Sequence, residues 1–219
     1  MSFQIAINRF EAKFGERLNL SLTMLSLAYL WVYSTQVLAR PAGLAAGLLN
    51  FAANSIYVIF GLDCLWKIVV YASQEKSKRN LRQFIFTMAL PVLALLAPAF
   101  RTLRLFRVLL TLRGFVGLVK NRAESAGLMV LLSFPIIAYT SALAILDVER
   151  NAAGSNITSL KDALWWALIT MTTVGYGDHY PVTDEGKLIA SGLLITGIVI
   201  FSTITAIVSS WILTERKTQ

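Results

Sequence analysis

The chain has 219 residues, of which 56% are hydrophobic and only 15% are charged, with a formal net charge of +8. A soluble domain carries roughly a quarter charged residues, so this composition argues against a soluble globular protein and favours a polytopic membrane protein. The single cysteine, Cys64, excludes a disulfide framework within the chain. The sequence contains no nucleophile, base or metal cluster typical of an enzyme. We therefore expect neither enzymatic activity nor a cofactor.

Six apolar runs near the length of a membrane span predict an all-α membrane protein with six transmembrane helices. In chain order they cover about residues 18–39, 47–73, 82–98, 100–118, 127–147 and 187–213. The residues before the first run carry charges of both signs and no cleavage site, so they predict a short interfacial helix. The expected organisation is an N-terminal segment 1–16, a four-helix domain 17–118, a linker 119–126 and a second domain 127–219.

Lys and Arg are distributed unevenly among the loops. If the N-terminus lies inside, the inner segments hold most of these residues and the outer segments hold few. By the positive-inside rule, both termini are expected in the cytoplasm of a multi-pass protein of the cell membrane, either plasma or inner membrane. The same bias accounts for much of the net charge, so no nucleic-acid partner is expected.

The fourth run carries arginines at strict three-residue spacing. Arg101, Arg104 and Arg107 are followed by Leu110, and Arg113 resumes the register. Arginine within the bilayer is costly and usually functional. A surface amphipathic helix would mix spacings of three and four, whereas strict threes spiral around an α-helix or line up on a 3₁₀ stretch. The pattern resembles the voltage-sensing fourth span of six-span cation channels, and an interfacial helix is the alternative.

In the second run, Phe60, Asp63 and Lys67 lie at successive helical turns. This arrangement resembles the charge-transfer site of the same channels, in which an aromatic side chain lies above an acid. The alternative is that Asp63 and Lys67 only neutralise each other at i,i+4. The first and third runs contain no acid, so countercharges for the arginines are few. The voltage range, and whether the sensor functions, therefore stay open.

Between the fifth and sixth runs, "ALWWALITMTTVGYGD" is too short to cross a membrane twice. Ser159 and Asp162 have the spacing of a capping box, which predicts a half-length helix from about residue 160 to Thr172. The negative end of this helix would point toward the bilayer centre and favour a cation. Gly175 and Gly177 tolerate positive φ, so successive carbonyls can point to one side. Four copies around an axis would be needed to surround an ion.

Residues 160–215, with "ALWWALITMTTVGYGDHYPVT", resemble the pore of potassium channels, whose filter sequence is TVGYG. The resemblance implies a re-entrant pore helix and a selectivity filter that binds the permeant K⁺ through backbone carbonyls. The carbonyls are those of Thr173, Val174, Gly175 and Tyr176. The filter support implied is Trp165 and Trp166 as an aromatic cuff, Gly177, and Asp178 held behind the filter. Interfacial anchoring is the alternative for the tryptophans.

In the sixth run, Gly197 resembles the hinge glycine of this family, and close packing is the alternative. Helical spacing places Phe201, Thr205 and Ser209 on one face, where we expect the inner cavity and gate. Near the predicted filter, His179 is unassigned. The tripeptide 156–158 fits an N-glycosylation acceptor.

The resemblance as a whole implies a homotetrameric, voltage-gated K⁺ channel in the lipid bilayer, with a minimal, prokaryotic-type body and no cytoplasmic ligand domain. Two alternatives remain: a voltage-insensitive K⁺ leak channel with a relic sensor, and a non-conducting regulatory channel subunit. The sign of gating, and whether sensor domains are swapped between subunits, stay open.

Overall fold

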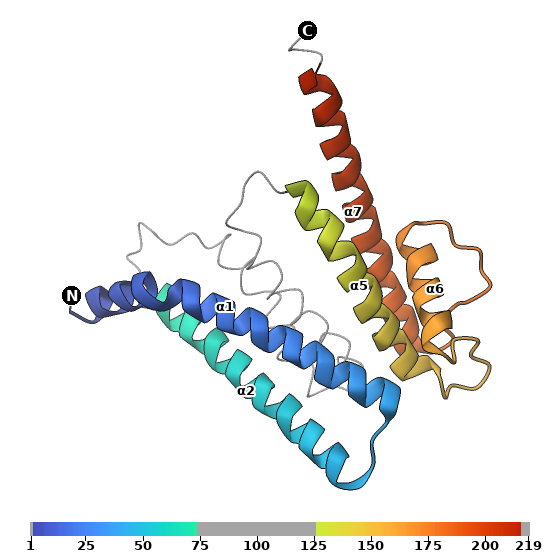
Figure 1. Ribbon diagram of the computed structural model, residues 1–219, viewed down its shortest axis with the longest axis horizontal. Coiled ribbons are helices and arrows are strands. Elements are labelled where there is room, and N and C mark those ends of the chain that lie inside the picture. Colours follow the sequence, from blue (N-terminus) through green and yellow to red (C-terminus); the bar gives the residue numbers. More distant parts are fainter. Residues whose placement is uncertain (1, 74–125, 216–219) are drawn as a thin grey trace. The chain divides into compact units, whose positions relative to one another are not determined.

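The computed structural model describes residues 2–73 and 126–215 (Figure 1). These residues contain helices and no strand, which confirms the all-helical prediction for the described part of the chain. The third and fourth apolar runs lie outside the described residues, and the four arginines of the fourth run lie there too. The helices are α1 (Ser2–Ala39), α2 (Gly43–Ser73), α5 (Ala126–Glu149), α6 (Leu160–Met171) and α7 (Asp184–Glu215).

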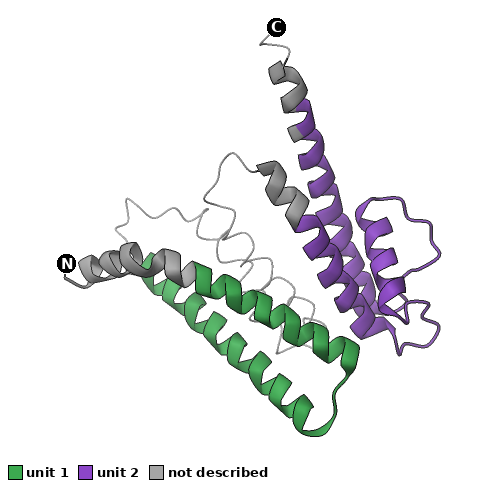
Figure 2. Ribbon diagram, viewed as in Figure 1, with its two compact units in different colours: residues 1–118 green, residues 119–219 purple. Residues whose placement is uncertain are grey.

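The chain divides into two compact units, residues 1–118 and 119–219 (Figure 2). In the first unit, α1 and α2 pack against each other as a helical hairpin (Figure 1). The expected N-terminal helix and the first apolar run are joined in one element, α1. The turn into α2 places Gly43 at a φ of 62°, a conformation that glycine adopts without steric cost.

Tyrosines hold the middle of the α1–α2 pair together. The ring of Tyr29 stacks on that of Tyr33 at 6.4 Å and meets that of Tyr57 edge-on at 5.6 Å. The hydroxyl oxygens of Tyr29 and Tyr57 lie 3.3 Å apart. All three rings are buried, so aromatic contacts and one polar contact fix how the two helices meet.

Three helices in the described part of the chain contain segments long and apolar enough to cross a membrane. These segments are Leu20–Ala39, Gly43–Ala72 and Asp184–Ala206. The first two also expose large apolar side chains, among them Met24, Trp31, Phe51, Val58 and Leu62. Exposed apolar surface of this extent is unusual on a soluble monomer. It supports a multi-pass membrane protein.

In the second unit, α5 packs against α6 and α7, and α6 packs against α7 (Figure 1). The core of this unit is built from fully buried side chains, notably Leu143, Ile145, Leu146 and Met171. Pro135 lies inside α5. Because proline has no N–H, it interrupts the hydrogen-bond ladder there, a feature that the apolar pattern did not predict. This three-helix core supports the loop that follows α6.

Candidate functional site

The first part of the site is α6, whose start is fixed by a capping box. Ser159 Oγ accepts a hydrogen bond from Asp162 N at 3.2 Å, and Ser159 N donates to Asp162 Oδ2 at 3.0 Å. The hydrogen bonds with Ser159 lower the pKa of Asp162. The predicted helix start is confirmed, and the helix ends at Met171, one residue before the predicted end. A helix of 12 residues is about 18 Å long, which is too short to cross the roughly 30 Å hydrocarbon core of a bilayer.

The segment that leaves α6 folds back onto the last turn of the helix. The carbonyl oxygen of Ile169 accepts hydrogen bonds from Val174 N at 3.0 Å and from Gly175 N at 3.2 Å. Thr173 N donates to Thr170 O at 3.1 Å. These bonds satisfy carbonyl groups that a helix end otherwise leaves without partners. The backbone of α6 therefore dictates how the next residues lie.

The same bonds set the direction of the following carbonyls. No peptide bond in the described residues is cis, and in a trans peptide the N–H and C=O groups point in opposite directions. Since the N–H groups of Val174 and Gly175 point at α6, the carbonyls of Thr173 and Val174 point away from it. The inner part of the segment thus presents consecutive carbonyl oxygens on the side opposite the helix.

The φ angles along the segment alternate in sign. They are positive at Thr173 (60°), Gly175 (56°) and Gly177 (78°), and not at Val174 or Tyr176 between them. Alternation of this kind places successive N–H groups on one side of the backbone and therefore the carbonyls on the other. Positive φ is free of cost for the glycines, but it strains a β-branched residue such as Thr173. The surroundings must therefore hold this conformation.

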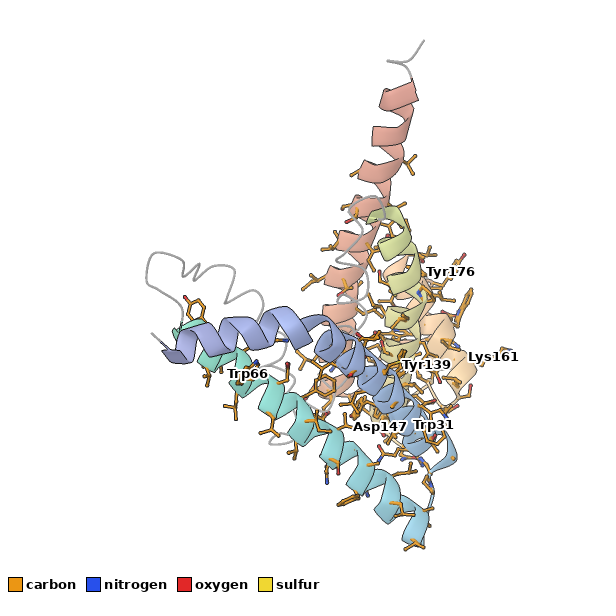
Figure 3. All side chains as sticks on the ribbon, turned by 60° about the vertical axis from the view of Figure 1, so that its left-hand side comes forward. Trp31, Trp66, Tyr139, Asp147, Lys161 and Tyr176 are labelled. Carbon is orange, nitrogen blue, oxygen red and sulfur yellow. The ribbon has the colours of Figure 1, made fainter. Side chains whose placement is uncertain are left out.

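Trp165 contacts the segment from the side. Its ring stacks on Tyr176 with centroids 5.8 Å apart and planes within 5°, and Tyr176 lies at the surface of the second unit (Figure 3). Trp165 Nε1 also donates to Asp178 Oδ2 at 2.6 Å, and this hydrogen bond lowers the pKa of Asp178. Trp166, its neighbour, is buried. The two tryptophans predicted as one cuff therefore differ, and the stacking with Tyr176 involves Trp165.

Two residues that the sequence did not single out for structural roles secure the chain beyond Asp178. Asn156, in the loop before α6, contacts Asp178, His179 and Tyr180. Glu149, the last residue of α5, is completely buried. Neither contact follows a helical or strand period, so no local sequence pattern signals it.

The carboxylate of Glu149 fastens the entry to α7. It accepts hydrogen bonds from Val182 N at 3.1 Å, Thr183 N at 2.9 Å and Thr183 Oγ1 at 2.6 Å. Thr183 Oγ1 in turn accepts from Gly186 N at 2.9 Å. A Cβ on Gly186 would overlap Glu149 Oε1 and lie 2.8 Å from Pro181 Cβ. Glycine is therefore required where α7 starts, because the carboxylate fills the adjoining space.

On α7, Gly197 lies against the end of α6. A Cβ at this position would be 2.6 Å from the carbonyl oxygen of Met171 and 3.0 Å from its Cα. This contact is the close packing named as the alternative to a hinge. The three residues predicted for the cavity and gate are exposed at four-residue spacing, which places them on one face. They are Phe201, Thr205 and Ser209.

In the first unit, Phe60 and Asp63 are both buried on α2. Lys67 Nζ lies 3.2 Å from Asp63 Oδ2. The i,i+4 neutralisation kept as an alternative is therefore formed. The arginines that a charge-transfer site would serve, Arg101, Arg104, Arg107 and Arg113, lie outside the described residues.

The second unit also has counterparts among known proteins. Residues 127–214 match the family model described as "Ion channel". This range contains the α6 helix and the carbonyl-bearing segment, so the matched region and the geometry coincide. The first unit lies outside it.

Several curated proteins are similar to the same part of the chain. The delayed-rectifier potassium channel regulatory subunit KCNS3 is 42% identical over 89 residues in Rattus norvegicus and 43% identical over 89 residues in Homo sapiens. Each alignment covers 41% of this chain and 18% of the relative. The potassium voltage-gated channel subfamily A member 5 of Rattus norvegicus is 41% identical over 73 residues, covering 33% of this chain and 12% of the relative. The chain thus spans less than a fifth of the length of these relatives.

Residues 127–214 are thus similar to ion-channel sequences, and the apolar helices are long enough to cross a membrane. The matched proteins are named as a channel regulatory subunit and as a member of a channel subfamily. This supports the expectation that the chain is not an enzyme.

Proposed function

We propose that the protein is a voltage-gated, K⁺-selective channel that conducts passively through a pore made by four copies of the chain. The observation that carries this proposal is the direction of the peptide groups after α6. The bonds from Val174 and Gly175 to Ile169 turn neighbouring carbonyls to the side away from the helix. The ion-channel match over residues 127–214 supports the same assignment.

In the proposed mechanism, carbonyls of residues 173–176 replace the hydration shell of K⁺ in stacked rings. One segment supplies only one side of each ring, so conduction requires a tetramer, which we take to be a homotetramer. Trp165 and Asp178 hold the segment at a fixed distance from the pore axis. The carbonyls of Leu168, Ile169 and Thr170 accept hydrogen bonds from residues 172–175, so they do not bind the ion directly. In the proposal α6 acts on the ion through its helix dipole.

Voltage gating is proposed for the first unit. Each charge that crosses the full field is worth about 2.3 kcal/mol per 100 mV. Four arginines in each of four subunits therefore give an upper limit of roughly 37 kcal/mol per 100 mV. A fraction of this energy would be enough to move a gate formed by Phe201, Thr205 and Ser209. The proposal includes both termini in the cytoplasm, as the distribution of Lys and Arg predicts.

A non-conducting regulatory subunit is the second candidate, because two of the similar proteins are named as regulatory subunits. In this candidate the chain would assemble with a conducting partner of the same architecture. The continuous filter motif 173–177 favours conduction by the chain itself. A voltage-insensitive leak channel with a relic sensor is a variant of the first proposal.

The test is a voltage-step recording of the purified, reconstituted chain with K⁺ and Na⁺ on opposite sides. We expect the reversal potential to shift by about 59 mV for each tenfold change in K⁺ and the open probability to depend on voltage. Arg104→Gln with Arg107→Gln should flatten that dependence, whereas Lys161→Gln, outside the sensor, should leave it unchanged. Absence of K⁺ current would favour the regulatory subunit, and an open probability independent of voltage would favour the leak channel.

A further inference from the structure

One residue of the loop before α6 bonds to three consecutive residues after the filter segment. Asn156 Nδ2 donates to the carbonyl oxygen of Asp178 at 2.8 Å, and Asn156 Oδ1 accepts from Tyr180 N at 3.2 Å. The backbone carbonyl of Asn156 lies 2.8 Å from His179 Nδ1. The two ends of one planar amide thus hold an acceptor and a donor that are two residues apart.

The loop that carries this amide is itself anchored on both sides of Asn156. Ile157, the next residue, is completely buried, and its N–H donates to Ser155 Oγ at 3.2 Å. The capping box of α6 begins at Ser159. The backbone of Asn156 is therefore held in place, so the hydrogen bonds of its amide can hold residues 178–180 in place as well.

The inner and outer ends of the segment are held differently. At the inner end, the Ile169 carbonyl fixes the peptide groups of residues 173–175 through backbone bonds alone. At the outer end, Gly177 has a φ of 78°, and the side chains of Trp165 and Asn156 bond to Asp178 directly after it. Trp165 holds the carboxylate of Asp178, while Asn156 holds the main chain.

We propose that Asn156 is a positioning residue that holds the outer end of the filter through an outer clamp formed by Asn156, Asp178 and Tyr180. This inference rests on the proposed function, since it assigns Asn156 to the K⁺ filter. By fixing the main chain just beyond Gly177, the clamp limits rotation of the last filter peptides. Without it, the outer carbonyls turn away from the ion more readily when a filter site is vacant.

The clamp also changes the interpretation of the tripeptide Asn156-Ile157-Thr158, which fits a glycosylation acceptor. N-glycosylation modifies the amide of asparagine, and here both ends of that amide are in use. The side chain would have to leave the clamp to be modified. The tripeptide therefore acts as part of the pore scaffold, and Thr158 offers a control that removes the acceptor pattern while keeping Asn156.

The experiment compares the reconstituted full chain with Asn156→Ala, Asn156→Asp and Thr158→Val. The measurements are the K⁺-over-Na⁺ permeability ratio and the decline of current during maintained opening, at low and high external K⁺. Two ordinary hydrogen bonds shift an equilibrium about tenfold or more, so the decline in Asn156→Ala should be about tenfold faster. High external K⁺ should slow it, because bound ions hold the carbonyls in place.

Asn156→Asp keeps the size of the side chain but sets a carboxylate oxygen against the Asp178 carbonyl. It should therefore decline at least as fast as Asn156→Ala, which excludes lost volume as the cause. Amide hydrogen exchange provides a second measurement. The N–H of Tyr180 should be protected in the wild type and in Thr158→Val, and should lose protection in Asn156→Ala.

Three outcomes overturn parts of the proposal and can be told apart. A wild type that conducts K⁺, with both Asn156 variants declining at the wild-type rate, overturns the clamp and leaves the channel function standing. If Thr158→Val reproduces Asn156→Ala, the effect does not depend on the Asn156 amide and the clamp is wrong; Thr158→Ser, which keeps both the acceptor pattern and a hydroxyl for Asp162, should behave as the wild type. A wild type that passes no K⁺ overturns the proposed function and the clamp with it.

Discussion

Each of the two units buries a carboxylate, and the two are held in opposite ways. Asp63 in the first unit has its cation, Lys67, four residues away on the same helix at 3.2 Å. Glu149 in the second unit accepts from two backbone amides and one hydroxyl at residues 182 and 183, across a loop and a helix. A flexible lysine can release its partner, whereas backbone amides in a packed core cannot. Asp63 is thus suited to exchanging partners, and Glu149 to holding a fixed geometry.

The largest expected effect is at Glu149. Glu149→Gln sets an NH₂ group against Val182 N, which lies 3.1 Å from Oε2, and it replaces the charged acceptor of the bonds at Oε1 by a neutral one. Such bonds are worth about 1.5–3 kcal/mol each, so the free energy of unfolding should fall by about 3 kcal/mol. Thermal unfolding in detergent measures this change. Asp147→Asn, which alters an exposed carboxylate on the same helix, should change stability by less than about 0.5 kcal/mol. If Glu149→Gln and Asp147→Asn lowered the stability equally, Glu149 would not hold a fixed geometry in the second unit, and the contrast with Asp63 would be lost.

The next largest effect is expected for Gly186→Ala, which tests whether the Glu149 carboxylate fills the space beside Gly186. In Gly186→Ala the new methyl would overlap Glu149 Oε1, and overpacking of this kind costs about 1–3 kcal/mol. Gly192→Ala is the matched control on α7, because nothing lies within 4 Å of its added Cβ. That variant should be neutral or stabilising by about 0.5–1 kcal/mol, since alanine favours a helix over glycine. A tolerated Gly186→Ala would mean that the start of α7 can shift without loss.

A smaller effect is expected at Lys67. Lys67→Gln removes a cation from a largely buried carboxylate and should lower the free energy of unfolding by about 1 kcal/mol. The control is Lys187→Gln, which breaks an ion pair of the same length, 3.2 Å, at a much more exposed site. That change should stay within about 0.5 kcal/mol. A double-mutant cycle with Asp63→Asn measures the coupling between Asp63 and Lys67 directly. A coupling as large as the loss in Glu149→Gln would show that Asp63 is also locked in place.

The smallest effect is expected at Asp178, whose carboxylate is exposed, in contrast to the buried carboxylates of Asp63 and Glu149. The hydrogen bond from Trp165 places its pKa below the usual value, which is about 3.9 for aspartate. A lowered pKa means that the stabilisation is present above the usual value and is lost only as the pH falls through the lower one. The indole N–H resonance of Trp165 should therefore stay unchanged between pH 8 and pH 5. Its disappearance in Trp165→Phe assigns the signal, and a midpoint inside that range would contradict the prediction.

The local features of the site were predictable from sequence because they depend on neighbouring residues. The spacing of Ser159 and Asp162 correctly predicted the start of α6, since a capping box involves only four residues. Gly175 and Gly177 indicated positive φ, which both adopt. By contrast, nothing local marked Thr173, where packing and hydrogen bonds hold a threonine in a strained conformation.

The contacts across the second unit were not predictable, because their partners lie far apart and share no period. Glu149 lies 33 residues before Val182, and Asn156 lies 24 residues before Tyr180. The pattern at Asn156 even suggested a different role, as a glycan acceptor. At Gly197 two interpretations fitted the sequence, and only the position of Met171 supplied the close contact. In α2, the alternative pairing of Asp63 with Lys67 is formed, while the role proposed for the arginines stays a prediction.

The double hydrogen bond to the Ile169 carbonyl has a consequence for protein engineering. The conformation of the pentapeptide 173–177 is determined by residues outside it, since α6 orients its inner peptide groups and Asn156 and Trp165 hold the residues that follow it. A graft of the five residues into another helical protein would therefore be a flexible loop. A portable cassette would have to include α5, α6 and the part of α7 that packs on them, from Ala126 past Gly197, and within it the length of α6 is fixed. One residue inserted between Trp165 and Ile169 would turn Ile169 and the segment after it by about 100° relative to Trp165, which would break the contacts of Trp165 with Tyr176 and Asp178.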